Sequence, residues 1–225
     1  MNRPFVIGLT GSIGTGKSTT ATMFRRFQIP VHESDQEVHK LLKEDPDVFC
    51  KIKALFPHCI EKGCIDRKAL GYHVFENVNA LKHLEEILHP RVRDLHMAFL
   101  EWHEEKKTPL VVLDIPLLFE AGYERVCDIV IATTCSPELQ QERVLKRPGM
   151  GLEKFRKILN NQLPGLEKQR RATYVLETSF GRADTFRRLR DILQDAVSKG
   201  NISQGLLLKM PCKSVLKKRV LLENA

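Results

Sequence analysis

The feature that most restricts the fold of this chain is an eight-residue segment near its start, Gly11-Ser12-Ile13-Gly14-Thr15-Gly16-Lys17-Ser18. It matches G-x-x-x-x-G-K-[ST], the pattern of a phosphate-binding loop (P-loop). An apolar run at 5–10 precedes it and a helical pattern at 17–27 follows it, which is the strand–loop–helix context that such a loop requires. This context predicts an α/β fold with a parallel sheet.

The residue types of the loop indicate how it would hold a nucleoside triphosphate. Glycines allow sharp turns and bring backbone N–H groups onto phosphate oxygens, and the following helix directs its positive end toward them. Lys17 is predicted to reach the β and γ phosphates, and the Ser18 hydroxyl to bind Mg²⁺. The predicted nucleotide site comprises Gly11, Ser12, Ile13, Gly14, Thr15, Gly16, Lys17, Ser18 and Thr19.

The rest of the chain alternates short apolar runs with helical stretches. Further strands are predicted at 29–32, 110–115, 128–133 and 174–177, and helices at 137–146, 152–163 and 183–199. Between 36 and 107 only helical periodicity is found, which indicates a helical insertion in the sheet. We therefore expect a three-layer core with a five-stranded parallel sheet from 1–35 and 108–199, a lid at about 147–172, an insertion at 36–107 and a basic tail at 200–225.

The charge of the chain indicates an anionic partner without naming it. With 36 Lys and Arg against 28 Asp and Glu, the net charge is +8, and about five of these charges lie after Ser198 (six basic residues against Glu223). No apolar run is long enough for a membrane span or a signal peptide, and the six cysteines are too scattered for a disulfide scaffold. We expect a cytoplasmic protein with free thiols and without a membrane partner, and a monomer, although sequence leaves the oligomeric state open.

The motifs around the loop narrow the class of nucleotide-binding protein. Neither N-K-x-D nor D-x-x-G occurs, which argues against a GTPase. The best candidate for the acid after a buried strand, Asp114, is followed by Ile115 and Pro116 rather than by a second acid, unlike mechanical ATPases. Small-molecule kinases remain, and these require a base for the acceptor hydroxyl and cations over the transferred phosphoryl group.

Glu33 and Asp35 are the candidate acids, because they follow the second strand where the carboxyl ends of parallel strands line a ligand crevice. In extended chain both side chains would point to one side, so that one could act as base while the other positions substrate or metal. Alternatively, Asp35 is the N-cap of the next helix.

The candidate cations are Arg143 and Arg147, which lie four residues apart and are predicted to share one face of a helix. The break at 148–151 that follows suits the hinge of a lid that excludes water on closure. Alternatively, these arginines belong to a solvated basic face.

Taken in order, these residues resemble the dephospho-CoA kinase family over residues 5 to about 197. The similar pieces are the P-loop, Glu33-Ser34-Asp35, Ile65-Asp66-Arg67, His89-Pro90, Asp114 to Glu120, Gln140 to Arg147, Gln162 and Glu167-Lys168. The resemblance implies ATP- and Mg²⁺-dependent phosphorylation of the ribose 3′-hydroxyl of dephospho-CoA, the last step of coenzyme A synthesis. It also implies that Asp35 is the general base, that Arg143 and Arg147 act from the lid, and that the insertion holds the acceptor. The acceptor site would then include Glu33, Asp35, His89, Pro90, Pro116, Leu117, Leu118 and Glu120.

The chain departs from the family pattern in three places. Glu33 stands where the family has Asp, and Ser12 replaces a loop glycine. Near the fifth strand the family has Ala-Asp and then Asn with small residues close to the adenine, whereas here Thr173 follows Ala172, and Thr178 and Ser179 stand further on. Two rival functions remain: another nucleoside or nucleotide monophosphate kinase, and a nucleic-acid-binding protein that uses the basic tail. The tail contains no Trp or Tyr for stacking on bases, so we expect no nucleic-acid partner.

Overall fold

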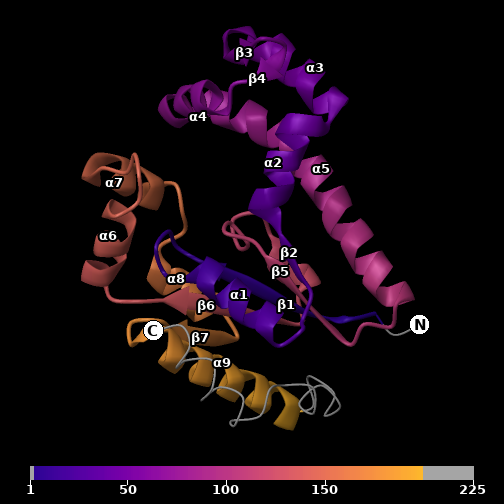
Figure 1. Cartoon of the computed structure of the whole chain (residues 1–225), viewed down its shortest axis with the longest axis vertical. Coiled ribbons are helices and arrows are strands. Elements are labelled where there is room, and N and C mark those ends of the chain that lie inside the picture. The colour runs from indigo at the N-terminus through magenta and orange to yellow at the C-terminus, as the bar shows by residue number, and fades with distance from the viewer. Residues whose placement is uncertain (1–2, 200–225) are drawn as a thin grey trace, which may run out of the picture. The chain divides into compact units, whose positions relative to one another are not determined.

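The computed structural model describes residues 3–199, and these form two compact units (Figure 1). One unit comprises the described residues up to His32 and from His103 onward, and the other comprises Glu33–Trp102. Each unit has its own cluster of buried apolar side chains. The predicted basic tail at 200–225 lies outside the described residues.

The first unit is built on a five-stranded parallel sheet with the order β2-β5-β1-β6-β7. Its strands are β1 (Phe5–Gly11), β2 (Val31–Glu33), β5 (Leu110–Asp114), β6 (Ile129–Thr134) and β7 (Tyr174–Glu177). β1 is central, because Ile7 is in register with Val112 of β5 on one side and with Ile129 of β6 on the other. The predicted α/β fold with a five-stranded parallel sheet is confirmed, and the P-loop follows the central strand.

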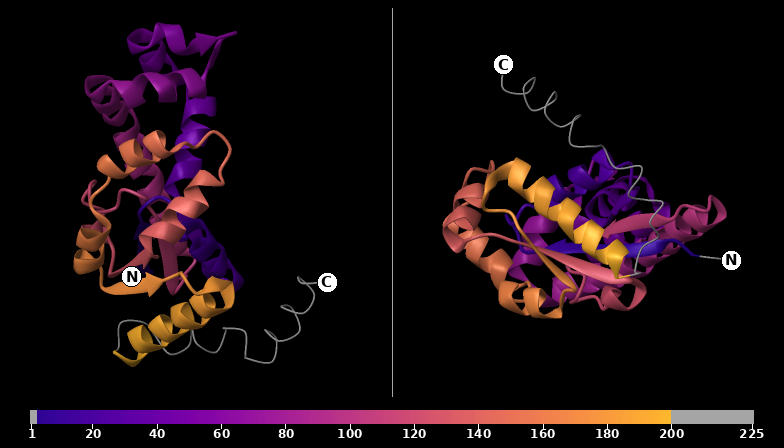
Figure 2. Two further views of the ribbon diagram at one scale, coloured as in Figure 1. Left: turned by 90° about the vertical axis from the view of Figure 1, so that its left-hand side faces the viewer. Right: turned by 90° about the horizontal axis from the view of Figure 1, so that it is seen from below.

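Both faces of this sheet are covered, which explains why its strands are continuous apolar runs. On one face Ile7 and Leu9 pack in a core with helices α1 (Lys17–Arg26) and α9 (Gly181–Ser198) (Figures 1 and 2). On the other face Gly8 lies beneath Leu118, near the 3₁₀ turn η2 (Tyr123–Val126), and α8 (Gly165–Arg171) packs on β6. The remaining helices of this unit are α6 (Pro137–Leu145) and α7 (Leu152–Asn160).

The second unit is mainly helical. It contains α2 (Ser34–Glu44), α3 (Pro46–Leu55), the 3₁₀ turn η1 (Pro57–Cys59), α4 (Arg67–Glu76) and most of α5 (Val78–Glu105). Ile52 and Leu70 are among the side chains buried in its core. Asp45 and Asp66 cap α3 and α4 by accepting backbone N–H groups of their first turns.

The prediction that the insertion contains no strand is wrong in one place. β3 (Ile60–Glu61) pairs antiparallel with β4 (Cys64–Ile65) across a turn at Lys62 and Gly63, which both have positive φ. Strands of two residues are too short to show the alternation by which a strand is recognised in sequence.

α5 is 28 residues long and contains Pro90. Its charged residues recur along its whole length, as expected of a helix with a solvated face. Between residues 3 and 199, no helix combines the length and the apolar character that crossing a bilayer would require.

Candidate active site

The P-loop leaves backbone donors available at the start of α1. Gly11 ends β1, and Lys17 begins α1 with Gly16 as its N-cap, which offers no side chain to the helix. The first bond from the following turn runs from Thr20 N–H to Gly16 O (3.0 Å). The N–H groups of Lys17, Ser18 and Thr19 therefore have no acceptor within the helix, and such a helix start is suited to an anion.

Gly14 shows why the loop needs glycine. Its φ is +82°, a conformation that side chains disfavour. A Cβ atom there would lie 2.6 Å from Val144 Cγ2 and 3.0 Å from the backbone oxygen of Gln140, both on α6. The loop therefore passes against α6 more closely than a side chain would permit.

Threonine hydroxyls hold the loop in this shape. Thr15 Oγ1 lies 2.8 Å from Ser12 O and 2.8 Å from Thr133 Oγ1 of β6. Thr178, after β7, donates its hydroxyl to Thr15 O (2.8 Å). The backbone is thus connected to the carboxyl ends of β6 and β7, which gives the loop a rigid support.

Lys17 forms an ion pair with Asp114 at the end of β5, with Nζ 2.6 Å from Oδ1. The Asp114 side chain is only 2% exposed and that of Lys17 is 14% exposed. The sequence indicated Lys17 as the phosphate-binding lysine and Asp114 as the candidate acid after a buried strand, and in the structure the two side chains are in contact. The Ser18 hydroxyl is exposed, and hydroxyl and carboxylate oxygens are the hard ligands that Mg²⁺ prefers, so these residues fit the predicted metal.

The two predicted lid arginines differ in their surroundings. Arg143 on α6 donates to the hydroxyl (2.9 Å) and to the backbone oxygen (2.8 Å) of Thr178, so it is held beside the loop. α6 ends at Leu145, and the exposed Arg147 follows it in a turn, with its N–H bonded to Val144 O. The prediction that both arginines lie on one helix face is therefore wrong, because the helix ends first.

The segment after β5 is tied into the first unit. Pro116 O accepts a hydrogen bond from Thr10 Oγ1 (3.0 Å) and another from Lys168 Nζ (2.9 Å). The Leu118 side chain is fully buried, whereas Leu117 is half-buried. Glu120 Oε1 accepts the Leu163 N–H (2.7 Å) and pairs with Lys168 (2.9 Å). Leu118 is thus part of the core, and one carboxylate oxygen of Glu120 is engaged in contacts within the protein.

Glu33 and Asp35 occupy the junction of β2 and α2. Glu33 is the last residue of the strand and the N-cap of the helix, and Asp35 lies in the first helical turn. The alternative in which Asp35 is the N-cap is therefore wrong, and so is the extended geometry expected for the pair. The buried Ser34 Oγ lies 2.9 Å from Nε2 of the buried His96 on α5, a contact that fixes the start of α2.

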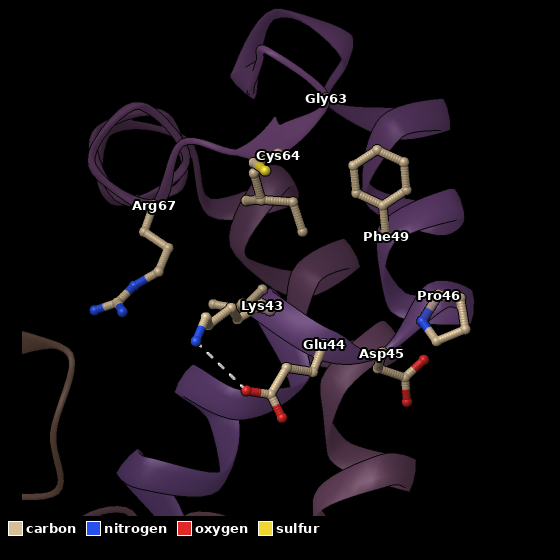
Figure 3. Close-up of a pocket in the computed structure, with 10 residues that line it drawn as sticks. Lys43, Glu44, Asp45, Pro46, Phe49, Gly63, Cys64 and Arg67 are labelled. Carbon is tan, nitrogen blue, oxygen red and sulfur yellow. Dashed lines mark ion pairs between the residues drawn. The ribbon is translucent and has the colours of Figure 1, made fainter.

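His89 and Pro90 lie in α5, and both are exposed. The second unit also contains a cavity of about 410 Å³ between the end of α2, the start of α3 and the β3–β4 hairpin (Figure 3). Phe49 and Cys64 are among its lining residues, whereas His89 and Pro90 are not. The charged side chains at this cavity have partners within the unit, since Lys43 pairs with Glu44 and Arg67 contacts His39.

One thiol adjoins the P-loop. Cys135 Sγ lies 3.8 Å from Gly14 O, and burial, more than any charge, raises the pKa of this thiol above its ordinary value. Because only the thiolate is a strong nucleophile, Cys135 is expected to stay protonated and to serve as packing beside the loop.

Three residues contact the loop although the sequence assigned them no role. Gln140 bonds to the backbone oxygen of Ile13, Gln162 bonds to the Ile13 N–H, and Thr178 bonds to Thr15 O. Gln140 and Gln162 were visible only as pieces of the family resemblance. Their positions depend on how α6, α7 and α8 pack, which local sequence does not encode.

Comparison with known proteins agrees with this geometry. A family model described as dephospho-CoA kinase matches residues 5–184. A dephospho-CoA kinase of Rhizobium meliloti is 43% identical over 190 residues, covering 84% of this chain and 97% of the relative. A dephospho-CoA kinase of Novosphingobium aromaticivorans is 45% identical over 185 residues, covering 82% of this chain and 91% of the relative.

Solved structures give the same result. A protein from Thermus thermophilus superposes with a TM-score of 0.75 at 37% identity, covering 86% of this chain and 98% of that one. The dephospho-CoA kinase from Campylobacter jejuni superposes with a TM-score of 0.65 at 30% identity, covering 88% and 98%. The resemblance predicted from sequence is confirmed, and the chain belongs to the dephospho-CoA kinase family.

Proposed function

We propose that this protein transfers the γ-phosphoryl group of ATP to the ribose 3′-hydroxyl of dephospho-CoA, which yields coenzyme A and ADP. The observation that carries the proposal is the family match over residues 5–184, which includes the complete P-loop. The ion pair between Lys17 and Asp114 and the N–H groups at the start of α1 support it independently.

On the donor side, the N–H groups of Lys17, Ser18 and Thr19 bind phosphate oxygens. Lys17 exchanges Asp114 for the β and γ phosphates, because its flexible side chain is a mobile point charge. Ser18 is the proposed ligand of Mg²⁺, which neutralises charge that develops on the phosphates. Gly11, Ser12, Ile13, Gly14, Thr15 and Gly16 complete the nucleotide site.

On the acceptor side, Asp35 is the proposed general base. Its carboxylate takes the proton of the ribose hydroxyl, whose oxygen bonds to the γ phosphorus as ADP leaves. Glu33 positions the acceptor, and the insertion supplies further contacts, including His89 and Pro90. In the first unit Pro116, Leu117 and Glu120 belong to the proposed acceptor site, whereas Leu118 supports it from the core.

Of the predicted lid at 147–172, the lid role is proposed for the part up to the end of α7, because Gln162 bonds to the loop and α8 packs on β6. Arg143 and Arg147 are the proposed cations that approach the phosphates. Arg143 is already held beside Thr178, which itself bonds to the loop at Thr15 O. Arg147 is exposed beyond the end of α6, and closure of the lid would be needed to bring it to the phosphates. Closure would also exclude water and so favour transfer over hydrolysis of ATP.

A coupled assay of ADP release tests the proposal with dephospho-CoA, AMP, CMP and adenosine as acceptors. We expect dephospho-CoA to have the highest kcat/KM by a wide margin, and Lys17→Ala to abolish transfer to it. Preference for another acceptor would refute the assigned substrate but leave the kinase chemistry. Full activity of Lys17→Ala would refute the nucleotide site itself.

A further inference from the structure

Two side-chain amides bond to the backbone of Ile13 in the P-loop. Gln140 Nε2 on α6 donates to Ile13 O (2.7 Å), and Gln162 Oε1 accepts the Ile13 N–H (3.1 Å). Because the backbone partners are a carbonyl and an N–H, they determine which end of each amide faces the loop. Residues outside the loop therefore orient the two peptide groups that flank Ile13.

Gln162 is held less directly than Gln140. Gln140 is part of α6, whereas Gln162 lies between the end of α7 at Asn160 and the start of α8 at Gly165. The next residue, Leu163, donates its N–H to Glu120 Oε1 (2.7 Å). The position of Gln162 thus depends on where Glu120 is held.

Glu120 is held by Lys168. The Lys168 side chain is 2% exposed, and its ammonium group lies 2.9 Å from Glu120 Oε1 and 2.9 Å from Pro116 O. A buried ammonium group is retained only where charge and hydrogen bonds compensate its lost hydration. Pro116 O also accepts from Thr10, the residue immediately before Gly11, so Lys168 is also connected to the residue that precedes the loop.

We propose that Lys168 is a positioning residue for nucleotide binding, which acts through Glu120 and Gln162 to hold the backbone N–H of Ile13 in the P-loop. This inference rests on the proposed function, because it concerns the ATP site of that reaction. A buried lysine in a merely structural role would support α8 without affecting the affinity of the loop for phosphates.

The experiment measures the dissociation constant of ATP by isothermal titration calorimetry, without acceptor, so that no turnover is needed. The variants are Lys168→Met, Gln162→Ala and the double variant. The control is Lys199→Met, which removes the same charge from an exposed ion pair with Asp195 (2.7 Å) at the end of α9.

Each single variant is expected to raise the dissociation constant about tenfold, since a site loses affinity when its supporting residues no longer hold it. The double variant should be no worse than the weaker-binding single variant, because both changes break one chain of contacts. Lys199→Met should bind ATP like the unchanged protein.

Gln162→Ala leaves the buried pair intact, so it tests the inference even if Lys168→Met fails to fold. Unchanged ATP affinity in Gln162→Ala, or multiplying effects of about a hundredfold in the double variant, would overturn the inference while the proposed function stands. Failure of the unchanged protein to bind ATP would overturn both.

Discussion

Replacement of Gly14 by alanine offers the sharpest test of how the P-loop is built. The substitution places a methyl group on a residue with φ +82°, at a cost of about 1–2 kcal/mol for a left-handed conformation. The new atom would also lie 2.6 Å from Cγ2 of Val144, whose side chain is fully buried and cannot withdraw into solvent. Such overpacking typically costs about 1–3 kcal/mol.

The two contributions add to roughly 2–5 kcal/mol, which corresponds to a fall of about 4–20 °C in the melting temperature of the first unit, where Gly14 lies. Differential scanning fluorimetry measures the shift. Gly122→Ala is the matched control, because Gly122 also has a positive φ (+70°) but no heavy atom within 4 Å of its added Cβ. It should lose only about 2–8 °C from the backbone contribution alone.

Equal shifts in Gly14→Ala and Gly122→Ala would refute the reasoning, because the close approach to α6 would then contribute nothing. The same variant reports on function. Relief of the clash must move the loop away from α6, so the KM for ATP is expected to rise in Gly14→Ala and to stay unchanged in Gly122→Ala.

Three further predictions concern other parts of the chain. Asp35→Asn should lower kcat by about 10²–10⁴ with little change in ATP affinity, whereas Asp94→Asn, at an exposed position of α5, should leave both unchanged in steady-state assays. Asn77 accepts the N–H groups of residues 79 and 80 at the start of α5, so Asn77→Ala should lower the free energy of unfolding in urea by about 0.5–2 kcal/mol and Asn77→Asp should restore it. Hydrogen bonding to Arg188, more than any other cause, lowers the pKa of Asp184. The stabilising effect of the Asp184 carboxylate should therefore be complete above about pH 4 and be lost as the pH falls further. The melting temperatures of wild type and Asp184→Asn should then converge at low pH.

The sheet could be predicted from sequence because its strands are buried on both faces. The runs at 110–115 and 128–133 are continuous and apolar, and they fall within a residue of β5 and β6. The helix ends were predicted less accurately, since α7 ends at Asn160 and not at residue 163 as predicted. What ends a helix is a local balance of capping and packing, which a periodic pattern does not contain.

The site was predictable where one short segment carries the chemistry. The P-loop and Lys17 could be identified because their geometry is local. The environment of Asp35 could not, because it depends on where β2 ends. An extended Glu33–Asp35 pair would require the strand to reach Asp35, but the strand ends at Glu33. The burial of Lys168 was not predictable, because lysine is normally a surface residue and only the packing of α8 excludes it from water.

The presence of two separate hydrophobic cores has a consequence for cooperativity. Ile52 and Leu70 lie in one core and Ile7 and Leu9 in the other, so the buried apolar cluster of each unit consists of its own side chains. Partial opening of such a chain is a subglobal event with its own free energy. Heat or denaturant should therefore reveal two transitions rather than one, and a ligand that binds only the P-loop should delay one of them selectively.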